Sequence, residues 1–157
     1  MKLILIKGYK HHGKSTFAKK LSLEKNIPVF SFATHLKKQV HSFLNVPMDY
    51  PKDQFLPHEN KTLRDYYKET ALFYRQSNPE YYVEKLFETL LQENITQAII
   101  DDFRFNIEIE YLRNKNVEIE TIHIINKQGL IPHIHDLSEH ELDAFICDFV
   151  IGLDFNV

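Results

Sequence analysis

One early run of residues constrains the fold of this chain more than any other feature. It spans residues 8–15, reads GYKHHGKS, and matches the pattern G-x-x-x-x-G-K-[ST]. The mostly apolar residues 1–7 before it are typical of a buried strand, and residues 16–21 after it carry apolar side chains at helical spacing. A strand, a glycine-containing loop and a helix N-terminus together form a cradle of backbone N–H groups for phosphate. We therefore expect a bound nucleoside triphosphate; the alternative is a strand-to-helix turn with a chance lysine.

The side chains of this run have separate expected roles. Lys14 would reach the β- and γ-phosphates of the nucleotide, and the Ser15 hydroxyl would hold Mg²⁺. The histidines of the loop contribute backbone N–H groups, so their side chains are expected to be incidental. The predicted cofactor-binding residues are Gly8, Tyr9, Lys10, His11, His12, Gly13, Lys14, Ser15 and Thr16.

Composition narrows the class of protein. The chain has 157 residues, 43% of them hydrophobic and 26% charged, which is enough for one domain with its own core. A net charge of −3 gives no general attraction to nucleic acid or to an anionic membrane. Cys147 is the single cysteine, so no intramolecular disulfide can form, and we expect it to be a buried small side chain. With no signal peptide or membrane-spanning run in this sequence, we expect a cytoplasmic protein.

Strand-like and helix-like patterns alternate along the chain. The predicted strands are residues 1–7, 27–32, 96–102, 117–125 and 148–151, and the predicted helices after the first are residues 34–44, 61–75, 79–92 and 106–114. This alternation predicts an α/β fold with one parallel sheet of about five strands and helices on both faces. We expect a single domain over residues 1–157, with a helical insertion at about 45–95 and a short lid-like segment at about 126–140.

Acidic and arginine side chains supply the candidate chemistry. Asp101 and Asp102 close an apolar strand, where one of them would hold Mg²⁺; the alternative is that they cap the following turn. Arg104 follows at the same strand end and could bind a phosphate. Arg64 and Arg75 are eleven residues apart and share one face of a predicted helix, which an ordinary solvated face would also explain.

Two weaker patterns are also present. His133, His135 and His140, with Asp136 and Glu139, form a candidate metal site without the spacing of a known one, and polar loop residues are the favoured interpretation. Several aromatic side chains could stack on a base, although core packing is the favoured role for most of them. They are Tyr66, Tyr67, Phe73, Tyr81 and Tyr82.

The order of the motifs resembles the deoxynucleoside monophosphate kinase family of bacteriophages and some other viruses. Residues 31–37 (SFATHLK) are similar to the family's S-F-A-x-x-L-K segment. Residues 64–82 look like its R…R-x-x-x-P-x-x-W block, with Tyr82 where tryptophan is usual. Residues 102–108 resemble D-x-R-F-x-x-E, and residues 135–139 and 148–151 resemble H-x-x-S-E and a closing D-x-x-I strand.

This resemblance implies a P-loop kinase fold and ATP-dependent, Mg²⁺-assisted phosphorylation of a deoxynucleoside monophosphate (dNMP). It implies Lys14, Arg64, Arg75 and Arg104 as catalytic residues. The metal residues would be Ser15, Asp101 and Asp102, and the substrate-binding residues Ser31, Phe32, Lys37, Arg64, Arg75, Tyr82, Asp102, Arg104 and Glu139. The partners would be small nucleotides, with neither nucleic acid nor membrane, and a homodimer is left open. A viral protein of this kind would act in the host cell cytoplasm.

Two alternatives stay open. One is a P-loop kinase for another small phosphorylated acceptor, similar in arrangement to animal-type phosphomevalonate kinase. The other is a nucleotide-binding regulatory module with little turnover. The segment after Ile125 contains Lys127 but no arginine, whereas nucleotide kinases usually close an arginine-bearing lid there. The family's G-T-E within the helical block is replaced by residues 70–72 (TAL).

Overall fold

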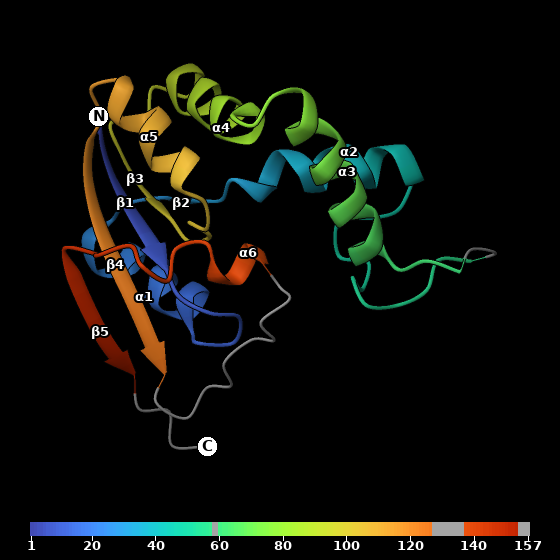
Figure 1. The fold of residues 1–157 in the computed structure, drawn as a ribbon, viewed down its shortest axis with the longest axis horizontal. Helices are drawn as coiled ribbons and strands as arrows, with labels where there is room; N and C mark the ends of the chain where they lie inside the picture. The colour runs from blue at the N-terminus through green and yellow to red at the C-terminus, as the bar shows by residue number, and fades with distance from the viewer. Residues whose placement is uncertain (58–59, 127–136, 154–157) are drawn as a thin grey trace.

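Five parallel strands form one sheet in a computed structural model, which describes residues 1–57, 60–126 and 137–153 (Figure 1). The strands are β1 (Lys2–Lys7), β2 (Val29–Phe30), β3 (Gln97–Ile100), β4 (Glu118–Asn126) and β5 (Phe149–Leu153). Their order in the sheet is β2-β3-β1-β4-β5, so β1 lies in the middle. The predicted parallel sheet of about five strands is confirmed.

The alternating side chains of β1 build two separate layers of core. Leu3 and Leu5 are fully buried on one face of the sheet, and Ile4 and Ile6 are buried on the other. Both faces are covered because a parallel sheet is joined by crossover helices. A strand buried on both sides is continuously apolar, which is why this segment was recognisable in the sequence.

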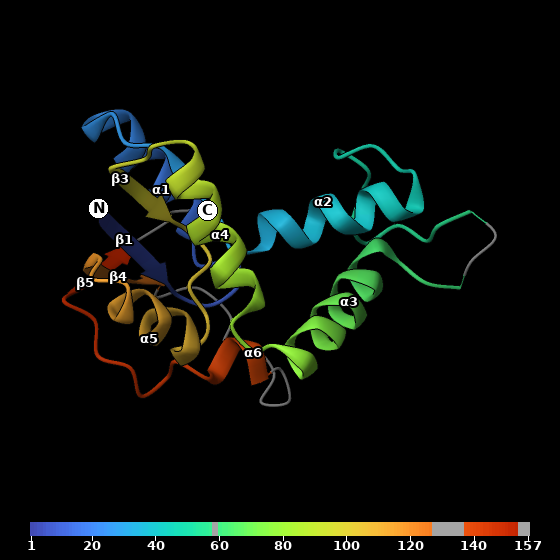
Figure 2. The same ribbon diagram turned by 90° about the horizontal axis from the view of Figure 1, so that it is seen from above.

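Helices cover the two faces unequally. Ala18 of α1 (Lys14–Lys25) packs with Ile4 and Ile6 on one face. On the other face, α4 (Tyr81–Gln92) and α5 (Asn106–Asn114) pack over Leu3 and Leu5. Figure 2 shows α1 and α5 on opposite sides of the sheet. The chain moves from β1 outward to β2 and then returns across the sheet, and right-handed crossovers place outward and returning helices on opposite faces.

A helical arm extends sideways from the sheet, made of α2 (Ala33–Leu44) and α3 (Leu63–Ser77) (Figures 1 and 2). A third apolar cluster holds it together, with Leu36 and Val40 of α2 packed near Leu63 of α3. Tyrosine side chains from α3 and α4 pack against the same cluster, in keeping with the core-packing interpretation. Of the expected helical insertion, α3 lies in the arm, whereas α4 belongs largely to the core over the sheet.

Several element boundaries differ from the predicted ones. The second strand is shorter at both ends than residues 27–32, and directly after it Ser31 donates to Asp102. The helix expected from Pro79 begins at Tyr81, since the Asn78 side chain accepts the Glu80 N–H at 3.0 Å and ends the preceding turn. A short helix, α6 (Leu137–His140), precedes β5. The histidine pattern at residues 133–136 and most of the expected lid lie outside the described residues.

Two further predictions concern membrane-spanning helices and the burial of the single cysteine. No helix within the described ranges has the length and apolar character to span a bilayer. Cys147 is half-buried rather than fully buried, and burial raises the pKa of its thiol.

Candidate functional site

The phosphate-loop residues join the end of β1 to the start of α1, as predicted. Gly8 has a φ of +150°, and a Cβ placed there would lie 2.5 Å from the carbonyl oxygen of Ile124 on β4. Gly13, with a φ of 89°, ends the loop in the left-handed region immediately before α1. Both positions therefore need glycine, one because the neighbouring strand is too close and the other because of its backbone angles.

Lys14 lies buried at the start of α1 and folds back over the loop. Its Nζ donates to the carbonyl oxygens of Gly8 at 2.6 Å and Tyr9 at 2.8 Å. Burial, together with the positive charge of Arg104, lowers its pKa to about 8. A lysine in this condition would gain most from an incoming anion, because a phosphate would stabilise its charged form.

Asp101 and Ser15 form the candidate metal site. Burial and the charge of Asp102 raise the pKa of Asp101, and the nearby Ser15 hydroxyl opposes part of this rise. Hydroxyl and carboxylate oxygens are hard donors of the kind Mg²⁺ prefers. No group of three or more His, Cys, Asp or Glu within the described residues could hold a metal alone. The fit is thus to an ion completed by water and phosphate oxygens.

Asp102 is engaged elsewhere. Its carboxylate accepts hydrogen bonds from the Ser31 hydroxyl at 2.6 Å, the Phe32 N–H at 2.8 Å and the Ala33 N–H at 3.0 Å. These groups lie where β2 passes into α2, so Asp102 acts as the N-terminal cap of α2. The two adjacent acids, equivalent in the sequence, have separate partners.

Arg104 lies in the turn between β3 and α5, and two glutamates hold it. Glu108 of α5 accepts the backbone N–H groups of Arg104 at 2.9 Å and Phe105 at 3.1 Å. The guanidinium pairs with Glu139 of α6, whose other oxygen accepts the Lys10 N–H of the phosphate loop at 2.7 Å. Arg104 is therefore fixed beside the loop at both its backbone and its side chain.

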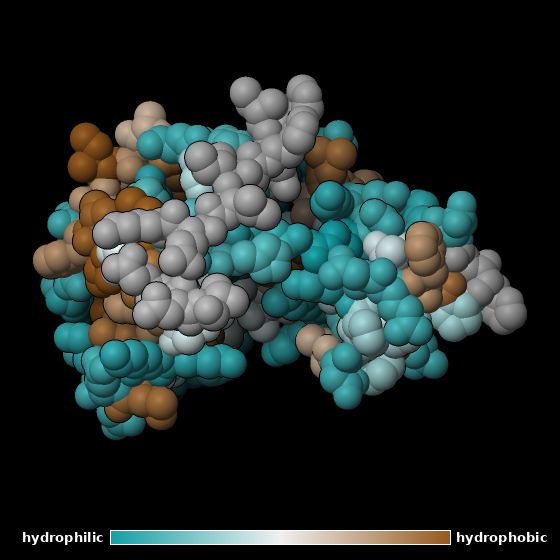
Figure 3. All heavy atoms as spheres, turned by 90° about the horizontal axis from the view of Figure 1, so that it is seen from below, coloured by the Kyte–Doolittle hydropathy of each residue, from teal (hydrophilic) through white to brown (hydrophobic). Residues whose placement is uncertain are grey.

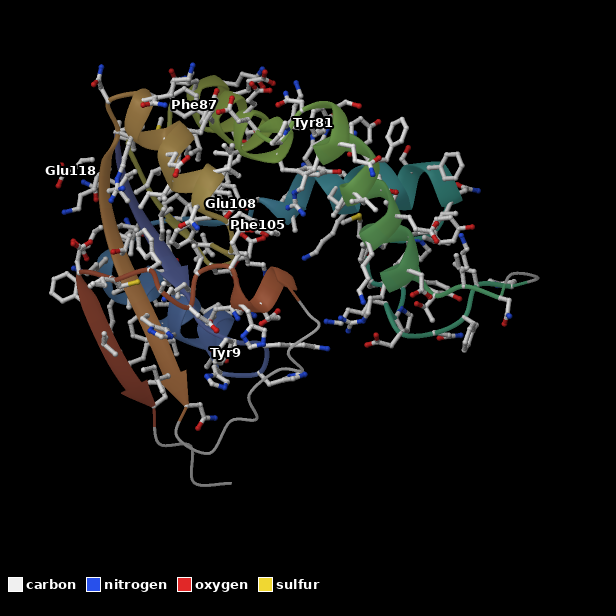
Figure 4. All side chains as sticks on the ribbon, viewed as in Figure 1. Tyr9, Tyr81, Phe87, Phe105, Glu108 and Glu118 are labelled. Atoms are coloured by element: carbon white, nitrogen blue, oxygen red, sulfur yellow. The ribbon has the colours of Figure 1, made fainter. Side chains whose placement is uncertain are left out.

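Arg75 approaches the same region from the end of α3. Its guanidinium carbon lies 4.2 Å from the ring centre of Phe105 and 5.4 Å from that of Tyr82. Figure 4 shows Phe105 beside Glu108 where α5 meets the arm, with Tyr9 of the loop further along the strand direction. Within the described part of the chain, no hydrogen bond or ion pair uses this guanidinium. Aromatic faces position the cation and leave its N–H edge available to an anion.

The remaining predicted residues are more scattered. Arg64 lies near the other end of α3, where its guanidinium pairs with Asp53. Tyr82 is buried, and no described residue accepts or donates a hydrogen bond at its hydroxyl. Lys37 is exposed on α2, with its charge close enough to lower the pKa of Asp101. His12 is buried, and its Nδ1 accepts the Asn126 N–H at 3.3 Å.

Contacts that the sequence did not predict tie the loop to residues 142–145. Buried Lys7 donates to the carbonyl oxygens of Leu142 at 2.6 Å and Phe145 at 2.8 Å. The Tyr9 hydroxyl donates to Asp143 at 2.8 Å. A lysine at the end of an apolar strand was the one signal for this role, since a buried ammonium needs acceptors. Figure 3 shows the molecule from below the view of Figure 1, where the carboxyl ends of the strands lie. On this side, the visible surface between the sheet and the arm is largely hydrophilic.

Comparison with known proteins identifies the fold. No known family model matches the sequence, and no curated protein matches it. The structure is similar to dephospho-CoA kinase from Campylobacter jejuni, with a TM-score of 0.50, 15% identity, and coverage of 99% of this chain and 90% of that one. The sheet, the loop and this similarity together show a P-loop kinase fold.

Two further solved structures were matched. An APS kinase from Mycobacterium tuberculosis has a TM-score of 0.48 and 13% identity, over 99% of this chain and 87% of that one. A protein of Chloroflexus aurantiacus described as a candidate kinase has a TM-score of 0.48 and 16% identity, over 80% of this chain. The matched region spans only 59% of the length of that protein.

The buried carboxyl of Glu108 should make stability depend on pH. Burial raises its pKa to about 8 from an ordinary 4.5, with Asp102 adding to the rise and Arg75 opposing it. The folded state therefore binds a proton that the unfolded state has lost, and its stability falls as pH rises from about 4.5 to 8. Glu108→Gln should remove up to ~1.4 kcal/mol per pH unit of this decline.

Denaturant titrations between pH 5 and 8 measure the effect. Glu110→Gln, an exposed position on the same helix, is the control and should follow the wild type. Parallel pH profiles for the wild type and Glu108→Gln would contradict the assignment.

Proposed function

We propose that this protein transfers the γ-phosphoryl group of ATP to a deoxynucleoside monophosphate, with Mg²⁺ assistance, and forms the diphosphate. The observation that carries the proposal is Arg75, whose guanidinium lies against the rings of Phe105 and Tyr82 and forms no ion pair among the described residues. A second cation, Arg104, directly precedes Phe105 in the chain, and its charge acts on the loop lysine, Lys14. A kinase with a phosphorylated acceptor needs cations on both sides of the transferred group.

The donor side of the proposed site is the phosphate loop. Its N–H groups and Lys14 would bind the phosphates, and Ser15 with Asp101 would hold Mg²⁺, which neutralises charge on the phosphate oxygens. Asp102 supports this arrangement indirectly, because it holds the start of α2 against the same strand end. We therefore propose Asp101 as the metal-linked acid.

The acceptor side requires no general base. A phosphate monoester has a second pKa near ~6, so its attacking oxygen is already largely anionic at neutral pH. The residues need only position two anionic groups and offset their repulsion. Arg75 would bind the acceptor phosphate, and Arg104 would bind the group in transfer. Their guanidinium forks match phosphate oxygens in pairs.

The nucleoside part of the acceptor would lie near Phe105, whose ring is next to Arg75. Phe105 is half-buried and would stack on a base, whereas Tyr82 is buried in the core and would act by packing. Dephospho-CoA kinase is named for a different acceptor, so the choice of a dNMP rests on these residues and on the motif resemblance. We place the reaction in the cytoplasm, with small nucleotides as partners.

The proposal predicts phosphoryl transfer to at least one of the four dNMPs. ADP release in a coupled assay should rise when that dNMP is added with Mg²⁺ and ATP, and should stay at background with non-nucleotide phosphates. Activity only with a non-nucleotide phosphate would favour another small-acceptor kinase. Tight ATP binding without transfer to any acceptor would favour a regulatory module.

The three arginines should differ in importance. Arg75→Ala and Arg104→Ala are each expected to lower kcat/KM for the acceptor on the order of 10²-fold or more, because charge that develops in transfer would lose its counterion. Arg64→Ala is the matched comparison on α3, and its loss should stay below about tenfold because its guanidinium is paired with Asp53. Near wild-type turnover in both Arg75 and Arg104 variants would refute their assignment. An equal loss in Arg64→Ala would mean that Arg64 also reaches the substrate.

Substitution of the two adjacent acids, Asp101 and Asp102, should affect different properties of the protein. Asp101→Asn should raise the Mg²⁺ concentration for half-maximal activity by about tenfold or more, because one hard ligand is weakened. Asp102→Asn should lower the free energy of unfolding by about 1–2 kcal/mol through the weakened cap, with a smaller change in Mg²⁺ dependence. Magnesium titrations of activity, alongside denaturant unfolding of both variants, make the comparison. Exchanged phenotypes would assign the metal to Asp102 instead.

A further inference from the structure

Glu139 of α6 reaches into the phosphate loop. Its Oε2 accepts the backbone N–H of Lys10 at 2.7 Å, and its Oε1 pairs with the Arg104 guanidinium. Only 4% of its side chain is exposed, and its charge also acts on Lys14. A loop N–H, an arginine and the loop lysine are the groups that a nucleotide phosphate would use. The Glu139 carboxylate therefore has the surroundings of a phosphate oxygen.

A neighbouring glutamate shows that this placement is specific to Glu139. Glu141, two residues further along, accepts the Asn106 N–H at 2.9 Å at the exposed start of α5 and contacts no loop residue in the described structure. The burial of an ionised carboxylate is costly unless its oxygens are satisfied. Both oxygens of Glu139 are satisfied, and each has a partner in the proposed phosphate site.

We propose that Glu139 is a positioning residue that holds Lys10 and Arg104 in their phosphate-binding arrangement before nucleotide binds, and that the incoming phosphate displaces its carboxylate. Arg104 then exchanges a carboxylate oxygen for a phosphate oxygen without leaving the loop. The inference rests on the nucleotide binding that belongs to the proposed function. It adds that nucleotide competes with a side chain of this chain.

The contacts around Glu139 allow it to leave without dismantling the loop. Lys7 and Tyr9 hold residues 142–145 through carbonyl and carboxylate groups that no phosphate needs. These contacts can persist while the Glu139 side chain withdraws. The displacement is therefore confined to one side chain and the short α6 helix that carries it.

The inference predicts that removing the charge of Glu139 strengthens nucleotide binding. Glu139→Gln keeps the shape of the side chain but removes the charge that competes with phosphate, so nucleotide should bind more tightly. An ion pair with only a structural role would leave affinity unchanged or weakened on removal. Because the bound nucleotide has already displaced this carboxylate in the wild type, kcat should change little while the affinity for ATP rises.

Calorimetric titration of the full chain with Mg²⁺–ATP, and with inorganic tripolyphosphate, tests this. Glu139→Gln should bind each about tenfold more tightly than the wild type, and Glu141→Gln should stay within about twofold of it. Glu139→Asp, which keeps the charge on a shorter side chain, should also bind more tightly and serves if the Gln variant does not fold. Unchanged or weaker binding by the folded Glu139 variants would overturn the inference.

Failure of this inference can be told apart from failure of the proposed function. Tighter binding by Glu139→Gln without transfer to any dNMP would support the inference and refute the proposed reaction. Transfer to a dNMP with unchanged affinity in the Glu139 variants would do the reverse. Absence of nucleotide binding in every variant and in the wild type would overturn both.

Discussion

The pairing of β1 with β3 on one side and β4 on the other determines where every candidate group lies. Leu5 is in register with Ile100 of β3 and with Thr121 of β4, so the three strands reach the same edge of the sheet. The register of the strands alone therefore brings the loop after β1 close to the acids after β3. The close approach of β4 to Gly8 is part of the same pairing, and it explains why this position has no side chain.

Unbalanced charge at this edge gives the site its chemical character. Lys14 is buried near a second cation, Arg104, and these surroundings lower its pKa. Arg75 is added from the arm and is held by aromatic rings rather than by an acid. Asp101 and Glu139 offset part of the positive charge. An anionic ligand would offset both the cost of burying Lys14 and the repulsion between the cations, because it would bring negative charge beside them. Under the proposed function, a phosphate group would supply that charge.

Residues that are equivalent in the sequence take different roles in the structure. Ser15 and Lys14 act on the pKa of Asp101, whereas Asp102 turns to the start of α2, because successive side chains at a strand end point to opposite sides. Arg64 and Arg75 do share one helix, as their spacing predicts. Eleven residues nevertheless separate them by about 16 Å along the helix axis, so they meet different neighbours.

Local patterns in the amino-acid sequence were enough to predict the strand–loop–helix unit, the alternation of strands and helices, and the polar residue types at the strand ends. Those features depend on local pattern: an apolar strand, glycines at fixed spacing and polar residues at strand ends. The three-dimensional packing was needed to show that Glu139 binds the loop, that Lys7 holds Leu142, and that Asp102 rather than Asp101 binds the start of α2. The first two contacts join distant parts of the chain, and the third depends on the different orientations of two neighbouring side chains. Sequence spacing carries no information about such contacts, since they depend on which helix the sheet brings to which strand end.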